Sequence, residues 1–163
     1  MDRLVVSTLP ASRPPARQPS AAMRAAAQQL REQAPYQPRE FWQAFLEDIT
    51  ANESVVTPEL VTRYHDINNR DGAKAWVDAY IQTQYRIWDT LDVPKYYGRL
   101  TRPILLQWGA DGVVLPEAIG GQVAALLKGA PVTLRQYRGA GHLPMMEQPA
   151  ATVRDAIEFL QAR

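Results

Sequence analysis

The stretch that decides the fold is "RPILLQWGADGVVLPEAIGGQVAALLKGAPVTLRQYRGAGHLPMMEQP", residues 102–149. Its short apolar run over 104–109 follows a proline and ends on a glycine, which is typical of a buried strand. An amphipathic helix is predicted over 116–130, and the alternating pattern over 132–141 predicts a second strand. A strand, a helix and a strand with short connections favour a βαβ unit and therefore a parallel sheet.

Polar residues follow both predicted strands. Asp111 comes just after the first strand, and His142 comes just after the second, behind Gly139 and Gly141. In a parallel sheet the groups that carry function lie at the carboxyl ends of the strands, so we expect Asp111 and His142 at the same edge. A carboxylate that accepts from one imidazole nitrogen fixes the tautomer and leaves the other nitrogen free to act as a general base.

The whole chain divides into three predicted parts. Residues 1–20 form a strand and a proline-rich loop, residues 21–98 form a helical region, and residues 99–163 form the α/β part. A final helix is predicted from Pro149 onward. Its inward-facing residues are expected to be Val153, Ile157 and Leu160.

The helical region is rich in tryptophan and tyrosine. Trp42, Trp76 and Tyr80 lie at helical spacing among other apolar residues. One interpretation is that these rings pack between helices, and the other is that they form the wall of an apolar ligand pocket. Both interpretations stay open at this point.

Composition excludes several classes of function. The formal net charge of +1 gives no electrostatic reason to expect nucleic acid as a partner. The chain has no cysteine, and its two histidines, His65 and His142, lack metal-ligand spacing, so no metal site is expected. No apolar run approaches the ~20 residues of a membrane span. The opening residues do not resemble a secretory signal, which favours the cytoplasm.

A family resemblance rests on several short motifs in fixed order over about 60 residues. The order is a strand ending in Trp-Gly, an acid loop, a proline, a helix, a strand, Gly-His-Leu-Pro, Glu-x-Pro and a helix ending in Phe-Leu. These motifs stand at Trp108-Gly109, Asp111, Pro116, Gly141-His142-Leu143-Pro144, Glu147-Gln148-Pro149 and Phe159-Leu160. This part of the sequence resembles the C-terminal part of α/β-hydrolase-fold proteins, and residues 21–98 resemble the helical cap of that family.

The resemblance implies a partial α/β-hydrolase fold with a parallel sheet of about three strands and a helical cap. It implies that His142 is the general base and that Asp111 is the acid which orients it. Trp42, Trp76, Tyr80 and Leu143 would contact a small, largely apolar substrate of the ester or amide type. The hydrolytic members of the family need no cofactor, so none is expected.

Two departures from the family pattern stand out. The family presents a nucleophilic serine in G-x-S-x-G, and none of the serines at 7, 12, 20 and 54 lies in such a motif. The oxyanion-hole loop is absent as well. In many relatives the acid lies four residues before the proline of its loop, where this chain has Gly112. Asp111 either serves from the neighbouring position or the acid has been lost.

Three hypotheses remain open. The chain is the C-terminal part of a hydrolase, inactive without the nucleophile half, or a non-catalytic remnant or interaction module, or one half of a split hydrolase. Only the addition of an N-terminal half would allow a small-molecule substrate to bind and react. A three-stranded sheet would have an exposed apolar edge, so we expect the isolated chain to associate with itself.

Overall fold

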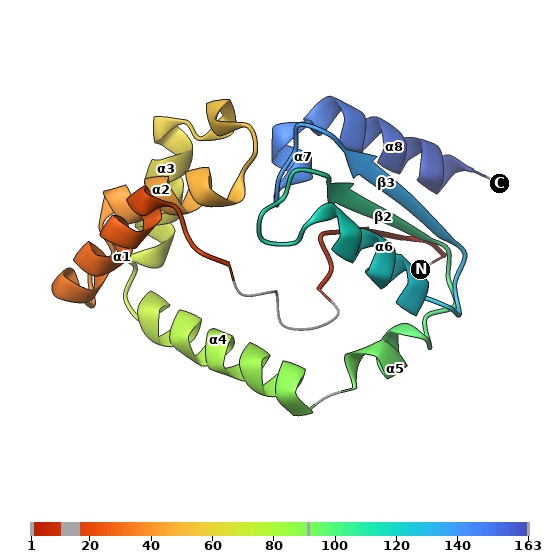
Figure 1. Ribbon diagram of the computed structural model, residues 1–163, viewed down its shortest axis with the longest axis horizontal. Coiled ribbons are helices and arrows are strands. Elements are labelled where there is room, and N and C mark those ends of the chain that lie inside the picture. The colour runs from red at the N-terminus through yellow and green to blue at the C-terminus, as the bar shows by residue number, and fades with distance from the viewer. Residues whose placement is uncertain (1, 11–16, 91, 163) are drawn as a thin grey trace. The chain divides into compact units, whose positions relative to one another are not determined.

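The computed structural model describes residues 2–10, 17–90 and 92–162 (Figure 1). Residues 11–16, which belong to the predicted proline-rich loop, lie outside the described part. The chain forms two compact units. The sheet unit contains residues 1–15, 49–52 and 92–163, and the helical unit contains 16–48 and 53–91.

The sheet unit contains three parallel strands, β1 (Leu4–Ser7), β2 (Ile104–Gly109) and β3 (Val132–Tyr137). Their order is β1-β2-β3, so β2 lies in the centre with a parallel partner on each side. All six residues of β2 are buried, as its mainly apolar run predicts, and the one polar side chain among them is Gln107. The short parallel sheet predicted from the sequence is therefore confirmed.

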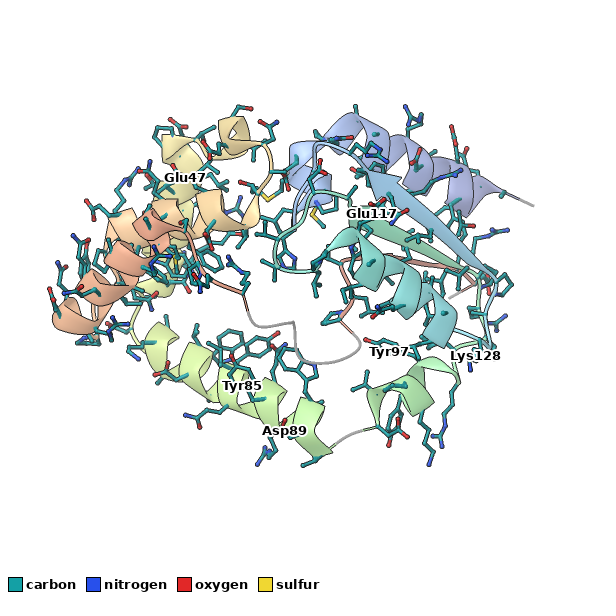
Figure 2. All side chains as sticks on the ribbon, viewed as in Figure 1. Glu47, Tyr85, Asp89, Tyr97, Glu117 and Lys128 are labelled. Carbon is teal, nitrogen blue, oxygen red and sulfur yellow. The ribbon has the colours of Figure 1, made fainter. Side chains whose placement is uncertain are left out.

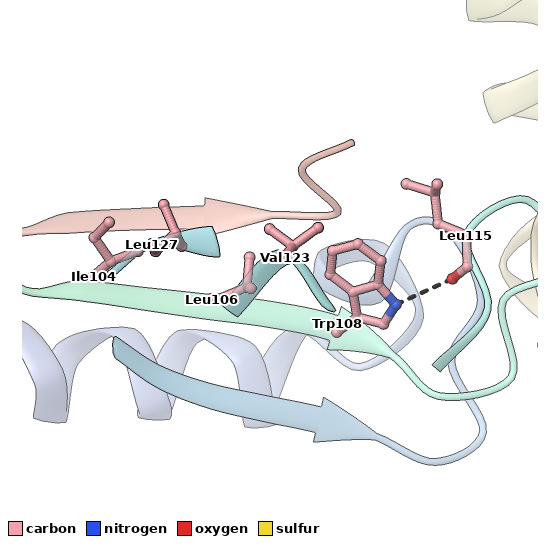
Figure 3. Close-up of a cluster of buried hydrophobic side chains, with 6 residues drawn as sticks. All are labelled: Ile104, Leu106, Trp108, Leu115, Val123 and Leu127. Atoms are coloured by element: carbon pink, nitrogen blue, oxygen red, sulfur yellow. Dashed lines mark hydrogen bonds between the residues drawn. The ribbon is translucent and has the colours of Figure 1, made fainter. Parts of the chain in front are cut away.

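One face of the sheet carries the main hydrophobic core (Figure 3). Alternate residues of β2, Leu106 and Trp108, point to helix α6 (Glu117–Leu126), where Val123 packs against them. The indole Nε1 of Trp108 donates to the Leu115 carbonyl at 3.0 Å, so the polar atom of this buried ring is satisfied. Short helix α5 (Val93–Tyr97) adds to this face: Tyr97, labelled in Figure 2, donates its hydroxyl to the Pro10 carbonyl at 2.6 Å.

The other face of the sheet meets helix α8 (Pro149–Gln161) through polar contacts. Gln107 of β2 is buried, and its Nε2 donates to the Thr152 carbonyl at 2.7 Å and to the Tyr137 hydroxyl at 3.0 Å. The Tyr137 hydroxyl in turn donates to the Asp155 carboxylate at 2.9 Å. Because these buried polar groups are hydrogen-bonded, the bonds offset the desolvation cost of packing them beneath α8.

The predicted orientation of this last helix was wrong. Val153, Ile157 and Leu160 are 55%, 49% and 54% exposed, whereas Thr152 is buried. The less exposed side of α8 instead carries Thr152 and the half-buried Ala156 and Phe159, and Gln107 Nε2 donates to the Thr152 carbonyl. The apolar stripe of α8 is therefore turned away from the sheet.

The helical unit is built from α1 (Ala21–Gln33), α2 (Arg39–Ile49), a 3-10 turn (Glu53–Val55), α3 (Pro58–Asn68) and α4 (Ala73–Thr90). Ser20 and Thr57 cap α1 and α3 by accepting from the Met23 and Leu60 amides at 3.1 and 3.2 Å. A core of Trp42, Leu46 and Val61 holds α2 against α3. None of the helices in the described ranges is long and apolar enough to cross a membrane.

Candidate functional site

The loops that leave the carboxyl ends of β2 and β3 touch each other. The Asp111 amide donates to the Ala140 carbonyl at 3.0 Å. A Cβ on Gly109 would lie 1.8 Å from the Gly141 carbonyl oxygen, so this close approach of two backbones requires glycine. The structure therefore brings the loop of Asp111 and the loop of His142 together at one sheet edge.

Asp111 contacts the turn that leads to His142. Its side chain is exposed, and Oδ2 accepts from the Gly139 amide at 2.6 Å. Gly139 has a φ of +77°, a left-handed conformation that favours glycine. The carboxylate thus holds the backbone of this turn three residues before the histidine. The neighbouring Gly112, which occupies the usual position of the acid, is buried and offers no carboxylate.

The backbone of His142 is held from two other parts of the chain. Its amide donates to the Ile49 carbonyl at 2.9 Å, and its carbonyl accepts from the Thr8 hydroxyl at 3.3 Å. Thr8 follows β1 and has a φ of +47°, an uncommon and strained conformation for a β-branched residue. Three segments distant in sequence therefore meet at a half-buried histidine.

Glu147 also supports the His142 loop, although the sequence analysis does not include it among the site residues. It lies at the end of the short helix α7 (Pro144–Glu147) and is only 6% exposed. Its carboxylate accepts four backbone N–H groups. The signal available in the sequence was an acidic residue five positions after His142 in an otherwise apolar segment.

The four predicted substrate-contacting residues lie in both units. Trp42 belongs to the wall of an apolar pocket of about 430 Å³ inside the helical unit. Trp76 and Tyr80 of α4 stack on each other, with ring centroids 5.4 Å apart, and are exposed. Leu143 is half-buried at the start of α7 in the sheet unit. Their contact with a substrate stays a prediction.

The residues that the structure describes contain no group of three or more His, Cys, Asp or Glu that could hold a metal ion. The chemistry that the sheet edge offers is that of an imidazole and a carboxylate.

No family model and no curated protein matches the chain. Solved structures do match. Cfl2 from Burkholderia cenocepacia is 22% identical with a TM-score of 0.67, and the match covers 98% of this chain and 57% of that one. The enol-lactonase from Burkholderia xenovorans LB400 is 15% identical with a TM-score of 0.64, over 99% and 57% of the two chains. The meta-cleavage product hydrolase CumD from Pseudomonas fluorescens IP01 is 17% identical with a TM-score of 0.61, over 98% and 55%.

These matches define the class of fold. The chain has a partial α/β-hydrolase fold, as the resemblance of its sequence implies. It spans about half the length of the solved structures that it matches.

Proposed function

We propose that these 163 residues supply the general base and the acid loop of an α/β-hydrolase, while the nucleophile comes from outside them. The substrate class is a small, largely apolar ester, amide or related compound. One observation carries the proposal: the loops of Asp111 and His142 touch at the carboxyl ends of β2 and β3. A base and an acid have to lie together in this way before one can orient the other.

In this proposal His142 takes the proton of the attacking group and later returns it to the leaving group. Asp111 orients the imidazole, and its bond to Gly139 holds the turn in place. Trp42, Trp76, Tyr80 and Leu143 provide apolar contact area for the substrate. The sequence contains no G-x-S-x-G motif, so in this proposal attack on the substrate needs a nucleophile from outside these 163 residues.

The first prediction concerns the 163-residue protein alone. We expect no turnover of nitrophenyl esters above the buffer background, because the base has no nucleophile to activate. A spectrophotometric assay of nitrophenol release measures this. Robust hydrolysis that disappears in His142→Ala would contradict the proposal.

The second prediction concerns a longer protein. If the DNA upstream encodes a G-x-S-x-G motif and a His-Gly loop, the extended protein should hydrolyse such esters. His142→Ala should then lower kcat/KM by about 10²–10⁴-fold, the usual contribution of a general base. His65→Ala is the matched control, because His65 bonds to Tyr36 and Asp66 within the helical unit and should leave the rate unchanged. Equal rates for wild type and His142→Ala would refute the role of His142.

A second candidate function is a non-catalytic module. The observation that favours it is Gly112, a buried glycine where many relatives carry the acid, beside an exposed Asp111. In that case the longer protein would hydrolyse none of the esters tested. The same would hold for this chain combined with a partner chain that carries the G-x-S-x-G motif. Activity that falls in Asp111→Asn would argue against this candidate.

A further inference from the structure

We propose that Glu147 is a positioning residue that clamps the His142 loop onto the turn at residues 49–52. The inference rests on the proposed role of His142, and it assigns to that site a support which the sequence does not reveal. Residues 49–52 interrupt the helical unit in the sequence, yet they belong to the sheet unit. The clamp lies entirely within the sheet unit.

Each oxygen of the Glu147 carboxylate holds a different segment. Oε1 accepts from the amides of Gly141 and Leu143 at 2.8 and 3.2 Å, the two residues on either side of His142. Oε2 accepts from the amides of Ala51 and Asn52 at 2.7 and 2.9 Å. A single buried side chain therefore joins the histidine loop to a turn about 90 residues away in the sequence.

The physical cost of losing this side chain is large. Hydrogen bonds to a charged acceptor are stronger than neutral ones, and a buried N–H left without a partner destabilises the folded state. Four amides depend on the same carboxylate. No apolar substitution can satisfy them, so the two segments can keep their places only with an acceptor at this position.

The two segments also touch directly. The His142 amide donates to the Ile49 carbonyl, and a Cβ on Gly141 would lie 2.7 Å from the Ala51 nitrogen and 2.8 Å from the Ile49 oxygen. The His142 loop therefore cannot move closer to residues 49–52 unless those residues also move. Glu147 prevents the opposite movement, because it holds both sides by hydrogen bonds. The backbone of His142 is thus fixed from two directions, and the clamp acts on the imidazole only through that backbone.

The test uses the 163-residue protein and the variant Glu147→Gln. Glutamine keeps the size of the side chain but replaces one acceptor oxygen with an NH2 donor that faces two N–H donors. We expect amide hydrogen exchange to accelerate at least about 10-fold at the two amides that lose their acceptor, within the set 51, 52, 141 and 143. We also expect the imidazole NMR signal of His142 to move while that of His65 stays.

The chain makes this experiment simple to interpret, because it has only two histidines. The His142→Ala spectrum assigns their signals. Glu158→Gln, an exposed substitution on α8, is the matched control and should move neither signal. These readouts report the geometry of the loop whether or not any substrate is hydrolysed. Failure of the proposed function therefore leaves this test valid, and a negative result here leaves the hydrolase proposal standing.

A second variant covers the case in which Glu147→Gln fails to fold. Gly141→Ala keeps the carboxylate but drives a Cβ into the turn at 49–52. We expect faster exchange at the Ala51 and Asn52 amides and a shifted His142 signal. If the protein remains folded and Glu147→Gln leaves the His142 signal and the four amides unchanged, the clamp does not exist. If Glu147→Gln does not fold and Gly141→Ala does, the second variant decides. The proposed clamp is then refuted when the His142 signal and the exchange rates of the amides at 51 and 52 stay unchanged in Gly141→Ala.

Discussion

At the scale of single residues, the site shows which roles a sequence can reveal. His142 and Asp111 could be selected because glycines and strand ends mark their loops. Thr8 could not, and Glu147 was marked only by its Glu-x-Pro motif, because the contacts of both residues depend on which distant segments meet in space. Gln107 was also missed: in the sequence it reads as one polar residue in an apolar strand, yet it carries the polar contact between the sheet and α8.

Tyr137 allows a prediction of pH dependence. Burial and the hydrogen bond to Asp155 raise the pKa of its hydroxyl from 10.0 to about 12. A raised pKa in the folded state means that its stabilising effect is complete below pH 10 and is lost as the pH rises toward 12. We expect this loss to lower the free energy of unfolding by on the order of 1–2 kcal/mol.

The measurement for Tyr137 is urea unfolding as a function of pH. Wild type should be more stable than Tyr137→Phe below pH 10, and the difference should shrink as the pH approaches 12. Comparing tyrosinate absorbance in the two proteins isolates the titration of this one residue. Ionisation of Tyr137 at the ordinary pH for tyrosine would contradict the prediction.

At the scale of elements, regular sequence patterns predict where a strand or helix lies, but they do not predict which side of a helix faces the sheet. The apolar run over 104–109 identified a buried strand, and this strand is β2. The orientation of α8 could not be obtained in this way. Apolar periodicity predicts that the stripe of Val153, Ile157 and Leu160 faces inward, whereas Thr152 is buried in the structure and its carbonyl accepts from Gln107.

Helix α6 offers two glycines in succession with opposite surroundings. A Cβ on Gly120 would lie 2.8 Å from the Trp108 ring, whereas nothing lies within 4 Å of one on Gly121. Gly120→Ala should therefore destabilise the protein by about 1–3 kcal/mol through overpacking. Gly121→Ala should stabilise it by about 0.5–1 kcal/mol, since alanine favours the helix.

Thermal or urea unfolding of these two variants checks the packing of α6 against β2, and each variant is the control for the other. Similar effects of the two substitutions would mean that Gly120 does not face Trp108. Tryptophan fluorescence, to which Trp108 contributes together with Trp42, Trp76 and Trp88, gives a second readout and should change only in Gly120→Ala.

At the scale of the whole molecule, the sheet is small and incompletely covered. In the described residues β1 pairs only with β2, and Val5 of β1 is 37% exposed. Parallel sheets are normally covered by other elements on both faces, whereas here the apolar side chain of Val5 is left partly exposed. The class of fold and the three-strand sheet were predictable from motif order. The exposed stripe of α8 was not, because it depends on the orientation of that helix.

The isolated chain should therefore associate with itself. Ile157→Glu places a charge in the middle of the exposed stripe and should shift the protein toward monomer. Gln122→Glu adds the same charge at an exposed position of α6, which does not belong to the stripe, and should have little effect. Sedimentation velocity over a range of concentrations measures both. A sharp monomer with cooperative unfolding at high concentration in the unmodified chain would show that these surfaces do not drive association.

The meeting of the acid loop and the histidine loop can be measured directly by through-space NMR contacts in the 163-residue protein. The Gly139 amide proton should show a cross-peak to the β-protons of Asp111, and the His142 amide should show one to Ile49. These contacts would establish the arrangement on which the hydrolase proposal depends. Contacts of the His142 loop with the opposite end of the sheet, near Pro103 and Pro131, would contradict it.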